Sequence, residues 1–393
     1  MFIISEAAGK IAGKLNLPAL IGYITAGIVC GPYVLGWFGQ MLVEQDLQFF
    51  REFALSIIAF SIGGTLQYAE LKRLRSSLAW ITLFQTSMAA ILVFGAIWWL
   101  LPFTTATAFE VHHVLAVALI LAAVSAATDP ATVLSLIDQY GGGDSFKAAL
   151  LGIVAIDDVI AILFYAVGFA LVGSILLETD GGVALTLGRA MFAVLTEAAI
   201  GLTVGLVVAQ SLIFFADYRS MLGLILGIIT AVTGFCLSIG ISPLFTSMVL
   251  GFMVTNVSKQ ELADEAMEVI HTIQQPVFGV FFFMAGAYLN IMLALASFGS
   301  ALLLSISRFA GKYLGTLIGG RVSATDKALT RSLGLALLPA AGVMIGLTMN
   351  ASDSFGAVLG ESGELMVSIV IGATLLNQVL TPFFVRAAIN RSK

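Results

Sequence analysis

Charge is what this sequence has least of. Only 10% of its 393 residues are charged, whereas soluble domains average about 25%. Hydrophobic residues make up 59% of the chain, and the mean hydropathy is +1.04. The net charge of −5 comes without a basic patch, which argues against nucleic acid as a partner. Membrane lipid must surround most of this chain, because no soluble core could hide so much apolar side chain.

The chain is also poor in metal-ligating side chains. Its two cysteines, Cys30 and Cys236, each lie in an apolar run and form no CxxC spacing. Its three histidines include the adjacent His112 and His113, whose side chains would point about 100° apart on a helix. We therefore expect buried thiols rather than a disulfide, no resident metal centre and no cofactor.

Long apolar runs are what the sequence has instead. A membrane helix needs about 20 mostly apolar residues, and the runs lack the alternation of a membrane barrel. The fold class predicted is an all-α membrane protein with about thirteen transmembrane helices. Whether the first run spans the membrane stays open, because it is short and carries Glu6, Lys10 and Lys14. The candidate spans are 2–14, 17–36, 50–67, 77–101, 112–137, 146–177, 183–215, 219–238, 242–257, 268–290, 296–319, 327–349 and 363–389.

Lysine and arginine fall mainly in every second loop. Lys72, Arg73 and Arg75 share one such loop, and the C-terminal tail carries Arg386 and Arg391. The positive-inside rule places loops of this kind in the cytoplasm. We therefore expect a cytoplasmic C-terminus and, with thirteen spans, an N-terminus outside.

Two stretches of the chain resemble one another. NLPALIGYITAGIVCG at 16–31 and GISPLFTSMVLGFMVTN at 240–256 each place a glycine, Gly27 or Gly251, eight or nine residues after a proline. The second stretch lies seven spans after the first, so corresponding helices would have opposite directions. That arrangement is typical of the inverted repeats of secondary transporters.

The repeat defines the expected organisation. Residues 1–177 would form a first six-helix repeat, 178–218 a linker helix and 219–393 a second six-helix repeat.

Two helices in matching positions of these repeats carry a proline among small residues. They are 112–137, with Pro130, and 327–349, with Pro339 and Gly342. A proline inside a helix removes a backbone hydrogen bond, and the freed carbonyls must find partners or line a wet cavity. We therefore predict two broken helices and an ion site near the middle of the membrane.

Two adjacent carboxylates interrupt the apolar helix 146–177. In the run IVAIDDVIAI, Asp157 and Asp158 lie among aliphatic residues. Ionisable groups inside a membrane are candidates for function, and neighbouring helical residues point about 100° apart. One aspartate can then face a cavity while the other faces a cation. Lys312 is the first candidate for that cation and Arg308, one turn earlier, is the alternative.

These residue types suit a monovalent cation that competes with protons. Sodium is a hard cation that favours oxygen ligands. Asp158 and Asp157 would supply carboxylate oxygens, and Thr128, Asp129 or freed carbonyls would complete the shell. The sequence therefore predicts ion and proton binding at one site.

The chain resembles the bacterial sodium/proton antiporters of the cation:proton antiporter superfamily, in its monovalent cation:proton antiporter-2 branch. The resemblance covers nearly the whole chain and rests on LPALIGYITAGIVCGP, ATDP, AIDDV and the GKYLG around Lys312. It implies a homodimeric transporter of the bacterial inner membrane with thirteen helices, two of them broken and crossing near the aspartates. A core domain and a dimerisation domain would each draw helices from both repeats, and the core would move in an elevator-like way during transport.

The resemblance also implies roles for single residues. Asp158 looks like the main carrier of the cation and the proton, and Asp157 looks like the partner of Lys312. Thr128 and Asp129 look like the polar residues at the first crossing. Paired aspartates imply electrogenic exchange of Na+ or Li+ for H+, with these ions as the only ligands.

Other functions remain to be weighed. A K+/H+ antiporter of the potassium-efflux type, without its soluble regulatory domain, is the alternative within the transporter class. No GxGxxG follows a strand, so we expect no nucleotide-binding domain on this chain. A channel would need a filter built by symmetric subunits, whereas the inverted repeat and the predicted helix breaks argue for alternating access. An intramembrane aspartyl protease would carry its aspartates on two facing helices, whereas Asp157 and Asp158 are adjacent on one helix. We therefore do not expect an enzyme.

Overall fold

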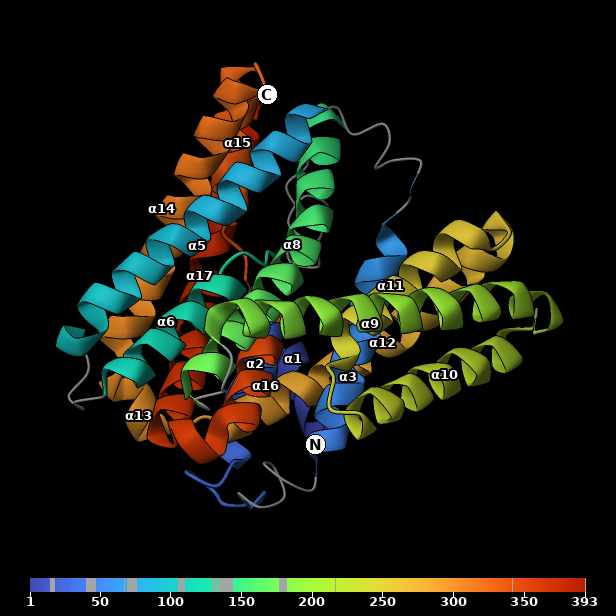
Figure 1. Cartoon of the computed structure of the whole chain (residues 1–393), viewed down its shortest axis with the longest axis horizontal. Helices are drawn as coiled ribbons and strands as arrows, with labels where there is room; N and C mark the ends of the chain where they lie inside the picture. Colours follow the sequence, from blue (N-terminus) through green and yellow to red (C-terminus); the bar gives the residue numbers. More distant parts are fainter. Residues whose placement is uncertain are drawn as a thin grey trace. The chain divides into compact units, whose positions relative to one another are not determined.

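A computed structural model of the chain is helical throughout its described part. The described residues are 1–14, 18–39, 47–66, 68, 76–104, 110–129, 133, 144–176, 182–215, 217–340 and 342–392. Every regular element in these ranges is a helix (Figure 1). Six of these helices are long and apolar enough to cross a membrane, and five shorter apolar helices have 10–17 residues. The all-α membrane class is therefore confirmed, while the count of thirteen spans stays a prediction.

The chain forms two compact units, and each unit combines two separate chain segments. Unit 1 comprises Met1–Arg73 and Ala190–Tyr288, and unit 2 comprises Leu74–Arg189 and Leu289–Lys393. Both units thus contain residues from before and after the middle of the chain.

Unit 1 is held together by helices whose backbones nearly touch. In α2 and α12, a Cβ atom added to Gly27 would overlap the carbonyl oxygen of Phe283, and one added to Gly286 would overlap that of Ile24. The contact is reciprocal: Gly27 meets Phe283, three residues before Gly286, and Gly286 meets Ile24, three residues before Gly27. The helices of unit 1 are α1 (Phe2–Lys14), α2 (Ala19–Cys30), α3 (Gln48–Thr65), the larger part of α9 (Gly182–Ser211), α10 (Tyr218–Ser238), α11 (Pro243–Val257) and α12 (Gln260–Tyr288).

The same reciprocal contact joins α3 to α11. A Cβ atom at Gly63 would overlap the carbonyl oxygen of Met248, and one at Gly251 would overlap that of Phe60. Gly251 and Met248 of α11 are numbered 224 higher than Gly27 and Ile24 of α2. Gly286 and Phe283 of α12 are numbered 223 higher than Gly63 and Phe60 of α3. Two helix pairs of unit 1 therefore use one packing arrangement at a nearly constant sequence offset.

Unit 2 is built around a close pair of helices, α5 and α14. Glycines recur at every fourth position of α14, which places them on one face. A Cβ atom would lie 2.5 Å from the Cα of Ala89 if added to Gly311, and 2.5 Å from that of Gln85 if added to Gly315. The helices of unit 2 are α5 (Ser76–Thr104), α6 (Val111–Val124), α8 (Asp144–Leu176), α13 (Ile291–Ala296), α14 (Phe298–Val322), α15 (Lys327–Ala336), α16 (Gly342–Leu359) and α17 (Glu361–Ser392).

Non-helical residues lie in unit 2 where the sequence predicts the two breaks. Helix α6 ends at Val124, and the next five residues, to Asp129, are not helical. Helix α15 ends at Ala336 and α16 begins at Gly342, so the predicted span 327–349 is broken. The backbone N–H of Asp129 donates to the carbonyl of Pro339 over 3.2 Å, so the two breaks touch. Pro130 lies outside the described residues.

Some predicted bounds were wrong. Helix α12 begins at Gln260, eight residues before the predicted span 268–290, because the added turns contain acidic residues that suit a helix but lower the hydropathy. The span predicted at 296–319 does not begin at 296, because the separate short helix α13 ends at Ala296. Helix α14 begins at Phe298, directly after the C-cap residue Ser297 of α13.

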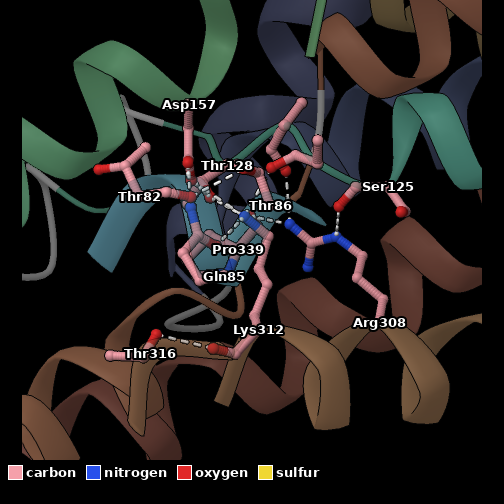
Figure 2. A network of polar contacts seen from close by, with 12 residues as sticks. Thr82, Gln85, Thr86, Ser125, Thr128, Asp157, Arg308, Lys312, Thr316 and Pro339 are labelled. Atoms are coloured by element: carbon pink, nitrogen blue, oxygen red, sulfur yellow. Dashed lines mark hydrogen bonds and ion pairs between the residues drawn. The ribbon is translucent and has the colours of Figure 1, made fainter. Parts of the chain in front are cut away.

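Arg308 of α14 fills the space between the two breaks (Figure 2). Its fully buried guanidinium donates to the carbonyls of Ser125 at 3.0 Å and Ala127 at 2.5 Å in the first break. It also donates to Leu338 at 2.6 Å and Pro339 at 3.2 Å in the second. A planar group with five N–H donors suits this task, and its charge balances the negative C-terminal ends of α6 and α15. Arg308 therefore supplies the hydrogen bonds that the broken helices lack.

We expect Arg308→Lys to destabilise the protein, since a lysine cannot reach four carbonyls at once. A buried carbonyl without a donor costs about 1–3 kcal/mol, so the midpoint of thermal unfolding in detergent should fall by about 5 °C or more. Arg321→Lys, at an exposed position near the end of the same helix, is the control. Equal midpoints for both variants would contradict the role given to Arg308.

A second prediction concerns the α5–α14 contact. Gly315→Ala should push the helices apart and lower the unfolding midpoint, because overpacking costs about 1–3 kcal/mol. Gly227→Ala is the matched control, since a Cβ atom there meets nothing within 4 Å. The contact is not tight if both alanine variants unfold at the same temperature in a fluorescence-detected melting assay.

Candidate functional site

A buried ion pair lies beside the first helix break, within unit 2. Lys312 Nζ on α14 is 2.9 Å from Asp157 Oδ2 on α8, and both side chains are 0% exposed. Burying two charges is costly, so a stable pair needs further hydrogen bonds around it. Figure 2 shows where these come from.

The ammonium of Lys312 is surrounded by oxygen atoms. Besides Asp157, it donates to the carbonyl of Ala126 at 2.6 Å, to Thr128 Oγ1 at 2.7 Å and to Gln85 Oε1 at 3.0 Å. The Ala126 carbonyl is available because α6 has already ended at Val124. The first break therefore contributes directly to the binding of this lysine.

The carboxylate of Asp157 has donors at both oxygens. Thr128 Oγ1 donates to Oδ2 at 2.7 Å, and Gln85 Nε2 donates to Oδ1. Thr128 and Gln85 each contact both members of the ion pair, so the four side chains form one network that joins α5, α8, α14 and the first break (Figure 2).

The structure gives Lys312 and Arg308 different partners. Sequence reasoning left open which of them faces Asp157, because they lie one turn apart on the same side of a helix. Lys312 contacts the carboxylate, whereas the four hydrogen bonds given above take Arg308 to backbone carbonyls.

The remaining predicted residues lie close by in the fold. Asp129 is half-buried at the contact between the breaks, and Gln378 Nε2 of α17 lies 3.5 Å from its Oδ2. Asp158 follows Asp157 in α8, but its side chain lies outside the described part of the structure. Pro339 is buried in the second break, and Gly342 is the first residue of α16.

Gln85 was missed by the sequence analysis, which considered only charged residues and helix breaks. The sequence pattern that could have identified Gln85 is a stripe of polar residues along one face of the apolar helix α5. Thr82, Gln85 and Thr86 are all fully buried, and the spacing i, i+3, i+4 places them on one face.

Comparison with known proteins agrees with this architecture. The sequence profile of a family described as "sodium/hydrogen exchanger, transmembrane" matches residues 2–390. A similar protein is the putative K(+) efflux antiporter KefB of Alkalimonas amylolytica, 25% identical over an alignment that covers 97% of this chain. The match covers 54% of that protein, so the chain spans about half the length of this relative.

Two solved structures share the fold. They are structures of the sodium proton antiporter MjNhaP1 from Methanocaldococcus jannaschii. One, determined at pH 8, superimposes with a TM-score of 0.80 at 15% identity and covers 99% of this chain and 96% of its own. The other, from an electron microscopy map, has a TM-score of 0.73 at 16% identity and covers 99% and 95%. With the profile match over residues 2–390, the chain belongs to the transmembrane sodium/hydrogen exchanger family of cation/proton antiporters.

Proposed function

We propose that this protein exchanges Na+ or Li+ for H+ across the membrane by alternating access. The observation that carries the proposal is the oxygen cage around Lys312. Four oxygens lie 2.6 to 3.0 Å from its ammonium, on Ala126, Thr128, Gln85 and Asp157. Carboxylate, hydroxyl and carbonyl oxygens are also the ligands that a hard cation prefers. An incoming cation therefore competes with a resident positive charge.

The exchange follows from this competition. Asp158 binds the cation and gives up its proton, with Asp129 nearby at the crossing of the breaks. When Asp157 turns to the cation, Lys312 loses its counter-charge and releases a second proton. Two protons then leave for each Na+ that binds, so the exchange is electrogenic. The reverse order of steps returns the site to the ion-paired state.

The two units provide a basis for the movement. Unit 2 holds the ion pair and both breaks, and we propose that it is the moving core domain. Unit 1 would then be the dimerisation domain of a homodimer. Basic residues in alternate loops support a cytoplasmic C-terminus and an external N-terminus in the inner membrane.

We also propose that residues 1–177 and 219–393 are inverted repeats joined by a linker helix at 178–218. The reciprocal glycine contacts of unit 1 support this. Helix α2 of the first repeat pairs with α12, and α11 of the second pairs with α3, at offsets of 224 and 223 residues. An exchange of partners between two repeats is what a pseudo-two-fold axis produces.

Exchange of K+ for H+ is the second candidate function. It is favoured by the relative named as a putative K(+) efflux antiporter. Both candidates use the same carboxylates, so the discriminating measurement is ion selectivity.

Asp158→Asn should abolish exchange. Purified protein in liposomes with a preformed pH gradient should restore the fluorescence of a pH-sensitive dye when Na+ or Li+ is added, and respond less to K+. The amide can neither release a proton nor neutralise the cation, so we expect a loss of at least about 100-fold. Asp264→Asn, at an exposed position of α12, should behave like the unmodified protein. Full activity of Asp158→Asn removes this residue from the mechanism, and a larger response to K+ than to Na+ favours the second candidate.

Lys312→Gln should change the charge moved in each cycle. The amide keeps a hydrogen bond to Asp157 but has no proton to release, so one proton rather than two should leave per Na+. A Na+ gradient should then generate a membrane potential with the unmodified protein and little or none with the variant. Lys259→Gln, at an exposed position before α12, is the control. An unchanged potential would show that Lys312 carries no transported proton.

A further inference from the structure

A stripe of buried polar residues runs along the apolar helix α17. Four polar side chains lie on one face of the helix, at spacing i, i+3, i+4 and i+7, and each is at most 1% exposed. They are Thr374, Asn377, Gln378 and Thr381. Val379 and Leu380, outside this stripe, are 49% and 42% exposed, which suits contact with lipid. The polar face of α17 is therefore turned into the interior of unit 2.

Helix α17 lies against both helix breaks. It packs on α6, which ends at the first break, and on α15 and α16, which flank the second. It also packs on α14, the helix of the buried lysine and arginine. Within the stripe, Gln378 Nε2 lies 3.5 Å from Asp129 Oδ2 in the first break and 3.5 Å from the Ala340 carbonyl in the second. The stripe is therefore beside the region in which we propose that the cation binds.

Asn377 differs from most buried polar residues of unit 2. Neither its Oδ1 nor its Nδ2 has a hydrogen-bond partner among the described residues, although the side chain is 1% exposed. The Thr374 hydroxyl, one turn earlier, also has no partner within this part of the chain. The Thr381 hydroxyl, in contrast, donates to the Asn377 carbonyl at 2.6 Å. A buried polar group without a partner lowers stability, so these two side chains call for a ligand.

The chemistry of the two unpartnered groups suits a cation that keeps part of its water shell. Amide carbonyl and hydroxyl oxygens are ligands that hard cations accept. The Nδ2 group of Asn377 can only donate, so it would bond a water oxygen of the ion's shell rather than the ion itself. Both side chains are uncharged, so they would hold the ion weakly enough to let it pass on to a carboxylate.

We propose that Asn377 and Thr374 form a second, uncharged binding position for the transported monovalent cation, which the ion occupies with part of its water before it reaches the carboxylates. The inference rests on the proposed exchange function and adds a binding position to it. It explains why an apolar membrane helix keeps an amide and a hydroxyl buried beside the breaks without a partner in the described protein.

The first test measures transport by Asn377→Leu. Leucine has the same branched shape but no polar atom, so the ion loses a ligand and a bond to its water. The Na+ concentration for half-maximal exchange should rise about 10-fold. Thr374→Val removes only a hydroxyl and should raise it about threefold. Thr381→Val is the control and should leave it unchanged, because the Thr381 hydroxyl is already bonded within its own helix.

A stability measurement tells a binding role from a structural one. In buffer with choline chloride and no Na+, Asn377→Leu should unfold at the same temperature as the unmodified protein or at a higher one. The reason is that an apolar group replaces an amide that has no partner in the described protein. A midpoint lower by about 5 °C or more would show that Asn377 is bonded within the protein, and would overturn the inference.

The same assay measures ion binding without transport. Replacing choline with Na+ should raise the unfolding midpoint, since a ligand of the folded state stabilises it. The Na+ concentration that gives half of this rise should be about 10-fold higher in Asn377→Leu. Such a shift in a protein that exchanges no ions overturns the proposed function alone. No rise in the unmodified protein, or the same concentration in Asn377→Leu and Thr374→Val, means that the stripe holds water only and overturns the inference.

Discussion

Two positive charges buried on one side of α14 organise the core of unit 2. Such charges are tolerated inside a membrane only when they are paired or hydrogen-bonded. Lys312 finds one carboxylate and three further oxygens, and Arg308 finds four backbone carbonyls. Five of these acceptors are carbonyls of the two breaks. The interrupted helices and the buried cations therefore depend on each other, since each satisfies what the other lacks.

Glycine determines how closely this arrangement can be packed. The glycine face of α14 brings its backbone against α5, and this brings Gln85 within reach of Lys312. In unit 1 the reciprocal glycine contacts join α2 to α12 and α3 to α11. Close backbone packing by small residues is typical of membrane helices, where the hydrophobic effect does not drive association. Both units thus use small residues to bring helix backbones close together.

Much of the fold could be predicted from the sequence, because a membrane helix is defined by a long apolar run. The breaks were also predictable in outline, since Pro339 lies where no continuous helix can form. The partner of Asp157 was not, because Lys312 and Arg308 share a helix face and only tertiary contacts separate them. Gln85 was missed because an uncharged amide in an apolar run has no distinctive pattern until a carboxylate and an ammonium are placed beside it. The turns that begin α12 at Gln260 were missed because hydropathy measures membrane burial, not helix length.

The hydrogen bonds of Arg308 have a consequence for how this region can change during evolution. All four of its acceptors are main-chain oxygens, which every amino acid provides. Substitutions at Ser125, Ala127 or Leu338 that preserve the backbone path therefore leave the recognition intact. We expect related sequences to keep the guanidinium at this position, while the side chains of these unwound segments change as far as their buried surroundings allow.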